Sequence, residues 1–418
     1  MKITVFGSGR EVGRSAILVS SEKNLLLDCG IKVRDEENPT GFPKINTKVD
    51  FSIITHGHLD HCGYAPVIKD CVFFSTPPTL AILELLIKDA KKVDPSLPFG
   101  IHDIENLLKK FILLPYGIEQ KIGNFKFILH DAGHIPGSSV VELNCENKKI
   151  VYTGDFKLEE TRLQHGGRIV EDVDVLIIEC TYSYLDHKPR KKIENEILSS
   201  INKTLNEGGN VIFPCFAVGR MQELELIFFN YDTELPVYSD GMGNEVSKIF
   251  LNYPPYIRNY IVYRKAISNA REVVDKKEPL SEPSVILSTA GMCEGGPVIN
   301  YILALDKEVK EEKKAGKIIF TGFCVKDTNG WYLQNTQTMY LKKSWKVKKK
   351  PVTVDIPIEV HHLSAHAGRN EILKFIEKAN PEKIICVHGE FCEDFAKELS
   401  EKGYDAIAPK NGEIIDIR

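Results

Sequence analysis

The segment Thr55–His61, with the sequence THGHLDH, places three histidines and one aspartate within seven residues. The whole chain of 418 residues contains only 12 histidines, so this local density is unusual. Crowded imidazoles do not help a loop to fold, whereas a metal ion requires several nitrogen and oxygen ligands that converge on one point. The segment therefore predicts a metal site whose remaining ligands come from elsewhere in the chain.

The spacing within this segment indicates two groups of ligands. His56 and His58 alternate, so both side chains point the same way from extended backbone. Asp60 and His61 follow where we expect the chain to turn, so they should face a different direction. The pattern H-x-H-x-D-H has little chance of arising at random, and a ligand set dominated by imidazole favours zinc over magnesium or calcium.

Other acidic residues and histidines follow apolar, strand-like segments along the chain. They are Asp28 after LLL, His134 after FILHDAG, Asp155 after IVYTG, Glu179 after LII and His388 after IICV. Strand ends at one edge of a sheet can converge, so residues that are distant in sequence can share one site.

We expect two Zn²⁺ per chain, bridged by the two carboxylate oxygens of Asp155. The predicted ligands are His56, His58 and His134 for one ion, and Asp60, His61 and His388 for the other. With the two aspartates and one hydroxide, such a site keeps a net charge of about +1. That charge favours an anionic substrate such as a phosphodiester.

Cleavage of a phosphodiester also calls for a general acid to protonate the leaving oxygen. His366, in HHLSAHAG, is the favoured candidate, with Glu179 as the carboxylate that orients it. Two alternatives remain: His362 competes as the acid, and Glu179 could instead cap the TYSY turn. We expect ordinary structural or surface roles for the remaining histidines discussed, which are His102, His130, His165, His187 and His361.

The composition is that of an ordinary globular protein, with 43% apolar and 27% charged residues. A net charge of -4 excludes a strongly basic polyanion-binding protein, so nucleic acid would have to bind in a local groove. No apolar stretch is long enough to cross a bilayer, so no membrane partner is expected. The 10 cysteines form no C-x-x-C pair, which favours a reduced, cytoplasmic protein.

The chain changes character twice. Short β-rich segments dominate the first part, an α/β pattern follows near residue 183, and the strand-rich style returns after KKKPVTVDIP. We therefore expect a first domain at residues 1–184, an inserted domain at 185–351 and a return to the first domain at 352–418.

These motifs together resemble those of metallo-β-lactamase-fold nucleases of the β-CASP group, in the branch of the cleavage and polyadenylation specificity factor. LLLDCG resembles the first motif with Asp28, and motifs A, B and C resemble IIECTY with Glu179, LSAHAG with His366 and VHGE with His388. The inserted half is similar to β-CASP signature segments, namely FAVGRMQEL, VYSDGMG, STAGMCEGGP and TGFCVKDTNG.

The resemblance implies an α/β protein, in which an αββα metallo-β-lactamase sandwich carries an inserted α/β β-CASP domain. It implies a zinc-dependent ribonuclease that cleaves single-stranded RNA, as an endonuclease, a 5′-to-3′ exonuclease or both, in RNA processing, 3′-end maturation or decay. His388 separates the chain from the DNA-repair branch, which lacks a histidine there. The chain length suggests the short archaeal type without KH domains, or a bacterial counterpart, and the family suggests a homodimer or an RNA-processing complex.

The resemblance assigns catalytic roles to Asp28, Asp60, Glu179 and His366. Candidate RNA contacts are Ser364 in LSAHAG, and Trp345, Lys346 and Lys348 in the basic segment LKKSWKVKKK. A solvated basic hairpin is the alternative reading of that segment, and HKPRKK (187–192) forms a second basic cluster. Two further functions stay open, a small-molecule hydrolase on the same fold and a non-catalytic scaffold subunit.

Overall fold

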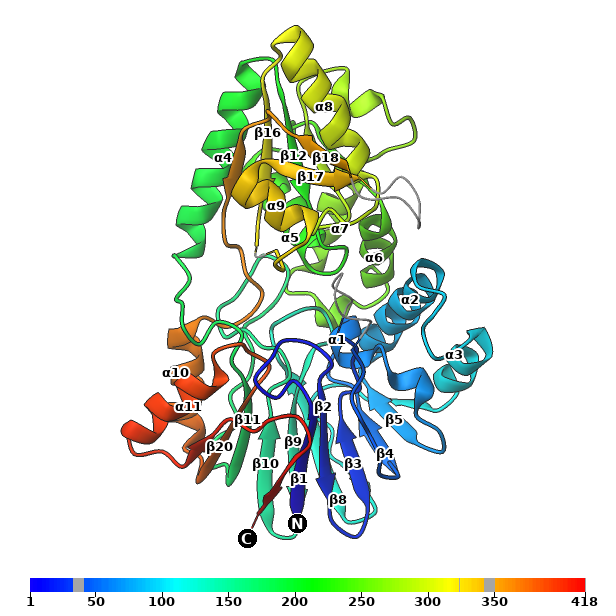
Figure 1. Ribbon diagram of the computed structural model, residues 1–418, viewed down its shortest axis with the longest axis vertical. Helices are drawn as coiled ribbons and strands as arrows, with labels where there is room; N and C mark the ends of the chain where they lie inside the picture. The colour runs from blue at the N-terminus through cyan, green and yellow to red at the C-terminus, as the bar shows by residue number, and fades with distance from the viewer. Residues whose placement is uncertain (33–40, 323, 342–349, 418) are drawn as a thin grey trace. The chain divides into compact units, whose positions relative to one another are not determined.

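The computed structural model describes residues 1–32, 41–322, 324–341 and 350–417 (Figure 1). The chain forms two compact units. The first unit comprises Met1–Asp186 and Ala365–Arg418, and the second unit comprises His187–Ser364. The second unit is therefore an insertion in the first.

The first unit contains two seven-stranded sheets. In spatial order, the first sheet consists of β22 (Glu413–Asp416), β1 (Lys2–Gly7), β2 (Ala16–Ser20), β3 (Asn24–Leu27), β4 (Phe51–Ile53), β5 (Val72–Ser75) and β6 (Phe111–Leu113). The second sheet consists of β21 (Ala406–Ile407), β20 (Lys383–Val387), β11 (Val175–Glu179), β10 (Lys148–Tyr152), β9 (Ser139–Cys145), β8 (Phe125–Asp131) and β7 (Gln120–Ile122). The C-terminal strand β22 pairs with β1, so the two ends of the chain lie side by side in Figure 1.

The main core of the first unit lies between the two sheets, because alternate strand residues point to opposite faces. Ile17 and Val19 of β2 pack in this core, whereas Leu18 faces the outer helices. In the second sheet, Ile177 of β11 points inward and Leu176 points outward. Both faces of these strands are therefore buried.

Helices cover the outer face of each sheet. α2 (Pro77–Val93) and α3 (Ile101–Leu108) cover the first sheet, while α10 (Arg369–Ala379) and α11 (Cys392–Glu401) cover the second (Figure 1). Proline at the first position suits the start of α2, because the amide that proline lacks would have no partner inside the helix. The result is the predicted αββα sandwich.

The second unit is an α/β layer around a six-stranded parallel sheet. In order, the strands are β14 (Arg271–Glu272), β13 (Val237–Asp240), β15 (Val285–Ser288), β12 (Asn210–Pro214), β16 (Gly316–Phe320) and β19 (Ile358–Val360). The helices are α4 (Arg190–Asn206), α5 (Arg220–Tyr231), α6 (Met242–Phe250), α7 (Tyr260–Asn269), α8 (Val298–Glu312) and α9 (Asn329–Thr336). α4 and α5 pack on one face of the sheet and α8 packs on the other. The predicted inserted α/β domain is confirmed.

The end of the second unit differs from the sequence-based boundary. We expected the first domain to resume at residue 352, but the second unit continues to Ser364. The reason is strand pairing: β18 (Lys350–Thr353) pairs with β17 (Thr338–Leu341), and β19 adds to the large sheet beside β16.

Among the described residues, no helix is both long and apolar enough to cross a membrane.

Candidate metal centre

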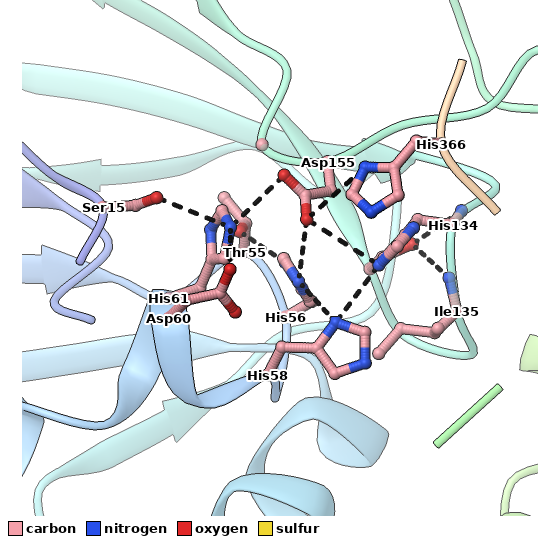
Figure 2. A network of polar contacts seen from close by, with 12 residues as sticks. Ser15, Thr55, His56, His58, Asp60, His61, His134, Ile135, Asp155 and His366 are labelled. Carbon is pink, nitrogen blue, oxygen red and sulfur yellow. Dashed lines mark hydrogen bonds and ion pairs between the residues drawn. The ribbon is translucent and has the colours of Figure 1, made fainter. Parts of the chain in front are cut away.

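The predicted ligands lie close together in the first unit, and Figure 2 labels all of them except His388. Each lies just after a strand, or in the short helix α1 (Leu59–Cys62) that follows β4. Three groups of possible ligands occur among the described residues: His56, His58, His134 and Asp155, which we call the first cluster; Asp60, His61 and His388, the second cluster; and Asp155 with Glu179 and His388. The short helix α1 carries Asp60 and His61, but the ring centroids of His56 and His61 lie only 4.1 Å apart, so the two clusters adjoin each other.

The first cluster has the spacing of ligands around one small cation. Nδ1 of His58 lies 3.1 Å from Nε2 of His56 and 3.2 Å from Nε2 of His134. Oδ2 of Asp155 lies 3.5 Å from the first of these Nε2 atoms and 3.8 Å from the second. Tetrahedral zinc with Zn–N bonds of about 2.0–2.1 Å separates neighbouring ligand atoms by roughly 3.3–3.4 Å. The observed separations bracket that value.

The second cluster faces the other oxygen of Asp155. Oδ1 of Asp155 lies 3.2 Å from Nε2 of His61 and 3.4 Å from Nδ1 of His388. Oδ2 of Asp60 lies 3.3 Å from Nε2 of His388 and 3.9 Å from Nε2 of His61. Each oxygen of Asp155 is therefore directed at a different set of imidazoles.

The protonation of His56 and His134 and the surroundings of Asp155 fit a bound metal. Burial lowers the pKa of His56 and of His134 well below the ordinary value, so both rings are neutral, as metal ligands must be. Asp155 is almost fully buried, yet no described residue makes a hydrogen bond of good geometry to its Oδ1. A buried carboxylate oxygen without such a bond is costly unless a cation lies beside it. The donor set therefore fits a metal cofactor.

Asp28 lies behind the second cluster and does not belong to it. Its Oδ2 accepts a hydrogen bond of 2.7 Å from Nδ1 of His61 and one of 2.9 Å from the hydroxyl of Tyr152. The backbone amide of Thr55 donates to Oδ1 at 2.7 Å, and the Thr55 hydroxyl donates to Oδ2 at 2.8 Å. Carboxylates in this position orient a histidine and set which nitrogen faces a metal. The catalytic role expected of Asp28 stays a prediction, and the structure places its carboxylate against His61, Tyr152 and Thr55.

The sequence did not point to the residues that support Asp28. Thr55 and Tyr152 are remote from it in sequence, and neither residue type signals a metal site by itself. Thr55 does lie directly beside the histidine motif, which is the one available hint.

Asp28 and His388 both have left-handed backbone conformations, with φ of 59° and 51°. This conformation costs L-residues roughly 1–2 kcal/mol, and such strain is often found at functional sites.

Glu179 and His366 form a close pair next to the first cluster. Nδ1 of His366 lies 3.1 Å from Oε2 and 3.2 Å from Oε1 of Glu179. Burial lowers the pKa of His366, but the carboxylates of Glu179 and Asp155 outweigh this effect and raise it to about 9. Glu179 also accepts hydrogen bonds of 2.8 Å from the Phe156 amide and 2.5 Å from the Thr181 hydroxyl. Glu179 therefore contacts both His366 and Thr181 of the TYSY turn, so its geometry is compatible with both roles that the sequence left as alternatives.

The remaining candidates lie elsewhere. His362 and Ser364 belong to the second unit. Trp345, Lys346 and Lys348 lie outside the described residues. Within the described part of the chain, the metal-binding groups include none of the histidines expected to be structural, which are His102, His130, His165, His187 and His361.

Family models match three stretches of the chain. The "Beta-Casp domain" model matches residues 221–333, and the "Zn-dependent metallo-hydrolase RNA specificity domain" model matches residues 353–409. The model described as "Anti-Pycsar protein Apyc1" matches residues 1–193. Together these matches cover most of both units.

Several curated archaeal proteins are similar over most of the chain. "Probable RNase MJ4" of Methanocaldococcus jannaschii is 35% identical, with 100% of both chains covered. "RNase aCSPSF2" of Saccharolobus solfataricus is 30% identical, covering 99% of this chain and 85% of the relative. "Transcription termination factor FttA" of M. jannaschii is 34% identical, covering 95% of this chain and 68% of the relative.

One solved structure is similar in fold. It is described as "Crystal Structure of a Protein of Unknown Function from Enterococcus faecalis V583", with a TM-score of 0.66, 13% identity and 99% of each chain covered. At this identity the likeness concerns the fold alone.

Proposed function

This chain belongs to the β-CASP family of metal-dependent hydrolases, and on that basis we propose that it is a zinc-dependent ribonuclease. It hydrolyses phosphodiester bonds of single-stranded RNA, as an endonuclease, a 5′-to-3′ exonuclease or both. One observation carries the proposal: the two oxygens of Asp155 face two separate clusters of imidazoles. A pair of closely spaced metal ions is an arrangement that suits phosphodiester hydrolysis.

Two zinc ions fit the two clusters. His56, His58 and His134 would hold one ion, Asp60, His61 and His388 would hold the other, and Asp155 would offer one oxygen to each. When bound, zinc supplies Lewis acidity that lowers the pKa of water and compensates the charge of the phosphodiester. Asp28 acts as a positioning residue, because its hydrogen bond directs Nε2 of His61 toward the centre.

The protein itself supplies the proton for the leaving group. Glu179 binds Nδ1 of His366, which leaves Nε2 of that ring directed away from the carboxylate. A protonated imidazole held in this way can donate to the oxygen that leaves phosphorus. We therefore assign His366 as the general acid and Glu179 as the residue that orients it.

The names of the relatives support RNA as the substrate. Two of them are named as RNases and the third as a transcription termination factor, and the chain is at least 30% identical to each. The matched model over residues 353–409 is described as an RNA specificity domain. We infer roles in RNA processing, including 3′-end maturation or decay, with Ser364 and the 341–350 segment as candidate RNA contacts.

The proposal also includes the cellular compartment and the assembly of the protein. All 10 cysteines are free, which suits a reducing cytoplasm. A homodimer or an RNA-processing complex is the assembly that the family suggests. A purely structural subunit would not need the full set of ligands, and a small-molecule hydrolase would not need the second unit.

Zinc content and RNA cleavage, measured on the same preparation, test the proposal. We expect about two zinc ions per chain and cleavage of a labelled single-stranded RNA that depends on them. A zinc-loaded protein that leaves the RNA intact but hydrolyses a small thioester would establish the alternative hydrolase.

A further inference from the structure

We propose that Tyr184 and Phe391 form a platform on which nucleobases of the RNA stack, next to the general acid His366. The proposal rests on the proposed ribonuclease function and names how the substrate is held. The three residues all belong to the first unit, and a chain of ring contacts connects them.

The ring contacts lead from the metal centre to the surface in three steps. The ring centroid of Tyr182 lies 6.2 Å from that of His366 and 6.3 Å from that of Tyr184. Tyr184 in turn lies 4.6 Å from Phe391, with the two rings tilted by 48°. An RNA strand that places its scissile phosphate at the metal centre can follow this path outward.

The outer two rings are exposed although they are large and largely apolar. Tyr182 is 8% exposed, but Tyr184 is 50% exposed and Phe391 is 42% exposed. Single exposed apolar residues are common on protein surfaces. Here two aromatic rings from distant segments contact each other and still present open surface, which is the form of a stacking site.

The platform is held in place before any ligand arrives. The side chain of Arg369 donates to the carbonyl of Ser183 at 2.7 Å, and its backbone amide donates to the carbonyl of Leu185 at 3.0 Å. Asn370 makes two hydrogen bonds to the carboxylate of Asp186, at 2.7 and 2.8 Å. The loop on both sides of Tyr184 is therefore fixed to the start of α10.

Phe391 is fixed as well, because it directly precedes α11. Its carbonyl accepts a hydrogen bond of 3.0 Å from the amide of Phe395, in the first turn of that helix. A binding surface that is already ordered loses little conformational entropy when the ligand binds. The backbone that carries both rings is therefore ordered before RNA binds.

The local charges favour bases over phosphates as the bound group. Glu390 directly precedes Phe391, and Arg369 already forms an ion pair with Glu398. Phosphate oxygens gain little from this surface, whereas every nucleobase offers a π-face to an aromatic ring. The platform therefore holds RNA through its bases and with little sequence preference, on the side of the leaving group that His366 protonates.

Equilibrium binding by the full zinc-loaded chain tests this directly. The probe is a fluorescent single-stranded RNA of mixed sequence, compared with the same oligomer lacking its bases at the positions on the leaving-group side. For Tyr184→Ala or Phe391→Ala we expect Kd for the intact RNA to rise about 5- to 100-fold. Tyr184→Trp should bind as well as the unsubstituted protein, because an aromatic face is restored.

The control is Ile118→Ala, an exposed apolar residue beside β7, at the opposite edge of the second sheet from β20 and β21. It should leave both Kd and cleavage unchanged. On the base-free oligomer, Tyr184→Ala should cause no further loss of affinity. If Tyr184→Ala weakened binding of both oligomers equally, or did not weaken binding of the intact RNA, the proposed platform would be wrong.

Cleavage assays on the same variants distinguish the proposed platform from the proposed ribonuclease function. Unchanged zinc-dependent cleavage with no effect of the alanine substitutions on Kd rejects the platform and keeps the ribonuclease. Tight, ring-dependent binding without any cleavage supports the platform and rejects the ribonuclease.

Discussion

The carboxylate of Asp28 accepts a hydrogen bond of 2.7 Å from Nδ1 of His61, on the opposite side of the ring from the nitrogen that faces Asp155. This contact makes Asp28 part of the metal centre although it is not itself in either cluster. Because the Asp28 carboxylate accepts the proton on Nδ1 of His61, it favours the tautomer in which the lone pair of Nε2 is available for a metal.

The first prediction concerns this contact. Asp28→Asn keeps the size of the side chain but weakens its ability to accept the proton of His61. We expect a loss of about 10- to 100-fold in zinc affinity, as is typical when such an orienting carboxylate is changed. Competition with a zinc chelator measures the affinity, and far-ultraviolet circular dichroism checks that the fold is kept. Unaltered zinc affinity would show that Asp28 acts only in folding.

The second prediction concerns proton donation by His366. His366→Asn should reduce kcat for RNA cleavage by about 10²- to 10⁴-fold, because the leaving oxygen loses its general acid. Zinc content should not change, since His366 is not among the predicted ligands. His102→Asn is the matched control, because that side chain is 96% exposed and pairs only with Glu105 among the interactions described. Equal rates for the two variants would remove His366 from the mechanism.

The third prediction concerns metal removal. A chelator should abolish RNA cleavage, and added Zn²⁺ should restore it better than Mg²⁺, because imidazole nitrogens dominate the ligand set. Full activity of chelated protein in magnesium alone would contradict the zinc assignment.

The fourth prediction concerns a buried acid in the second unit. Burial raises the pKa of Glu225 to about 8, despite a hydrogen bond of 3.1 Å from the Ser247 hydroxyl that lowers it. The folded state therefore holds this proton over a pH range in which the unfolded state has lost it. The contribution of Glu225 to the free energy of unfolding therefore falls as pH rises from about 4.5 to 8, by roughly 3 kcal/mol between pH 4.5 and 7.

Glu225→Gln removes this titration. The variant should gain stability relative to the unsubstituted protein on going from pH 5 to pH 8, as measured by thermal unfolding across that range. Glu234→Gln, at an exposed position, serves as the control. A constant difference between Glu225→Gln and the unsubstituted protein at all pH values would show that Glu225 does not hold a proton on folding.

Much of the centre could be predicted because its ligands stand in short motifs after apolar strands. His56, His58 and His61 share one segment, and Asp155 and His388 each follow a buried strand. Residues in such local motifs can be placed from the sequence alone, because strand ends at one edge of a sheet converge.

The features of the fold and the site that the sequence did not predict depend on contacts between distant segments. Strand β19 follows the predicted return to the first domain, yet it pairs with β16 of the second unit. Tyr152 supports Asp28 from a strand of the opposite sheet, and the ring of Phe391 meets that of Tyr184. None of these pairings leaves a periodic signal in the sequence, because each is decided by tertiary packing.

The most direct test of the central claim is a zinc-edge anomalous difference map from crystals of the zinc-loaded protein. We predict two peaks, one on each side of the Asp155 carboxylate, the first within bonding distance of His56, His58 and His134 and the second near Asp60, His61 and His388. A map without peaks beside Asp155, or with zinc only at other residues, would contradict the account.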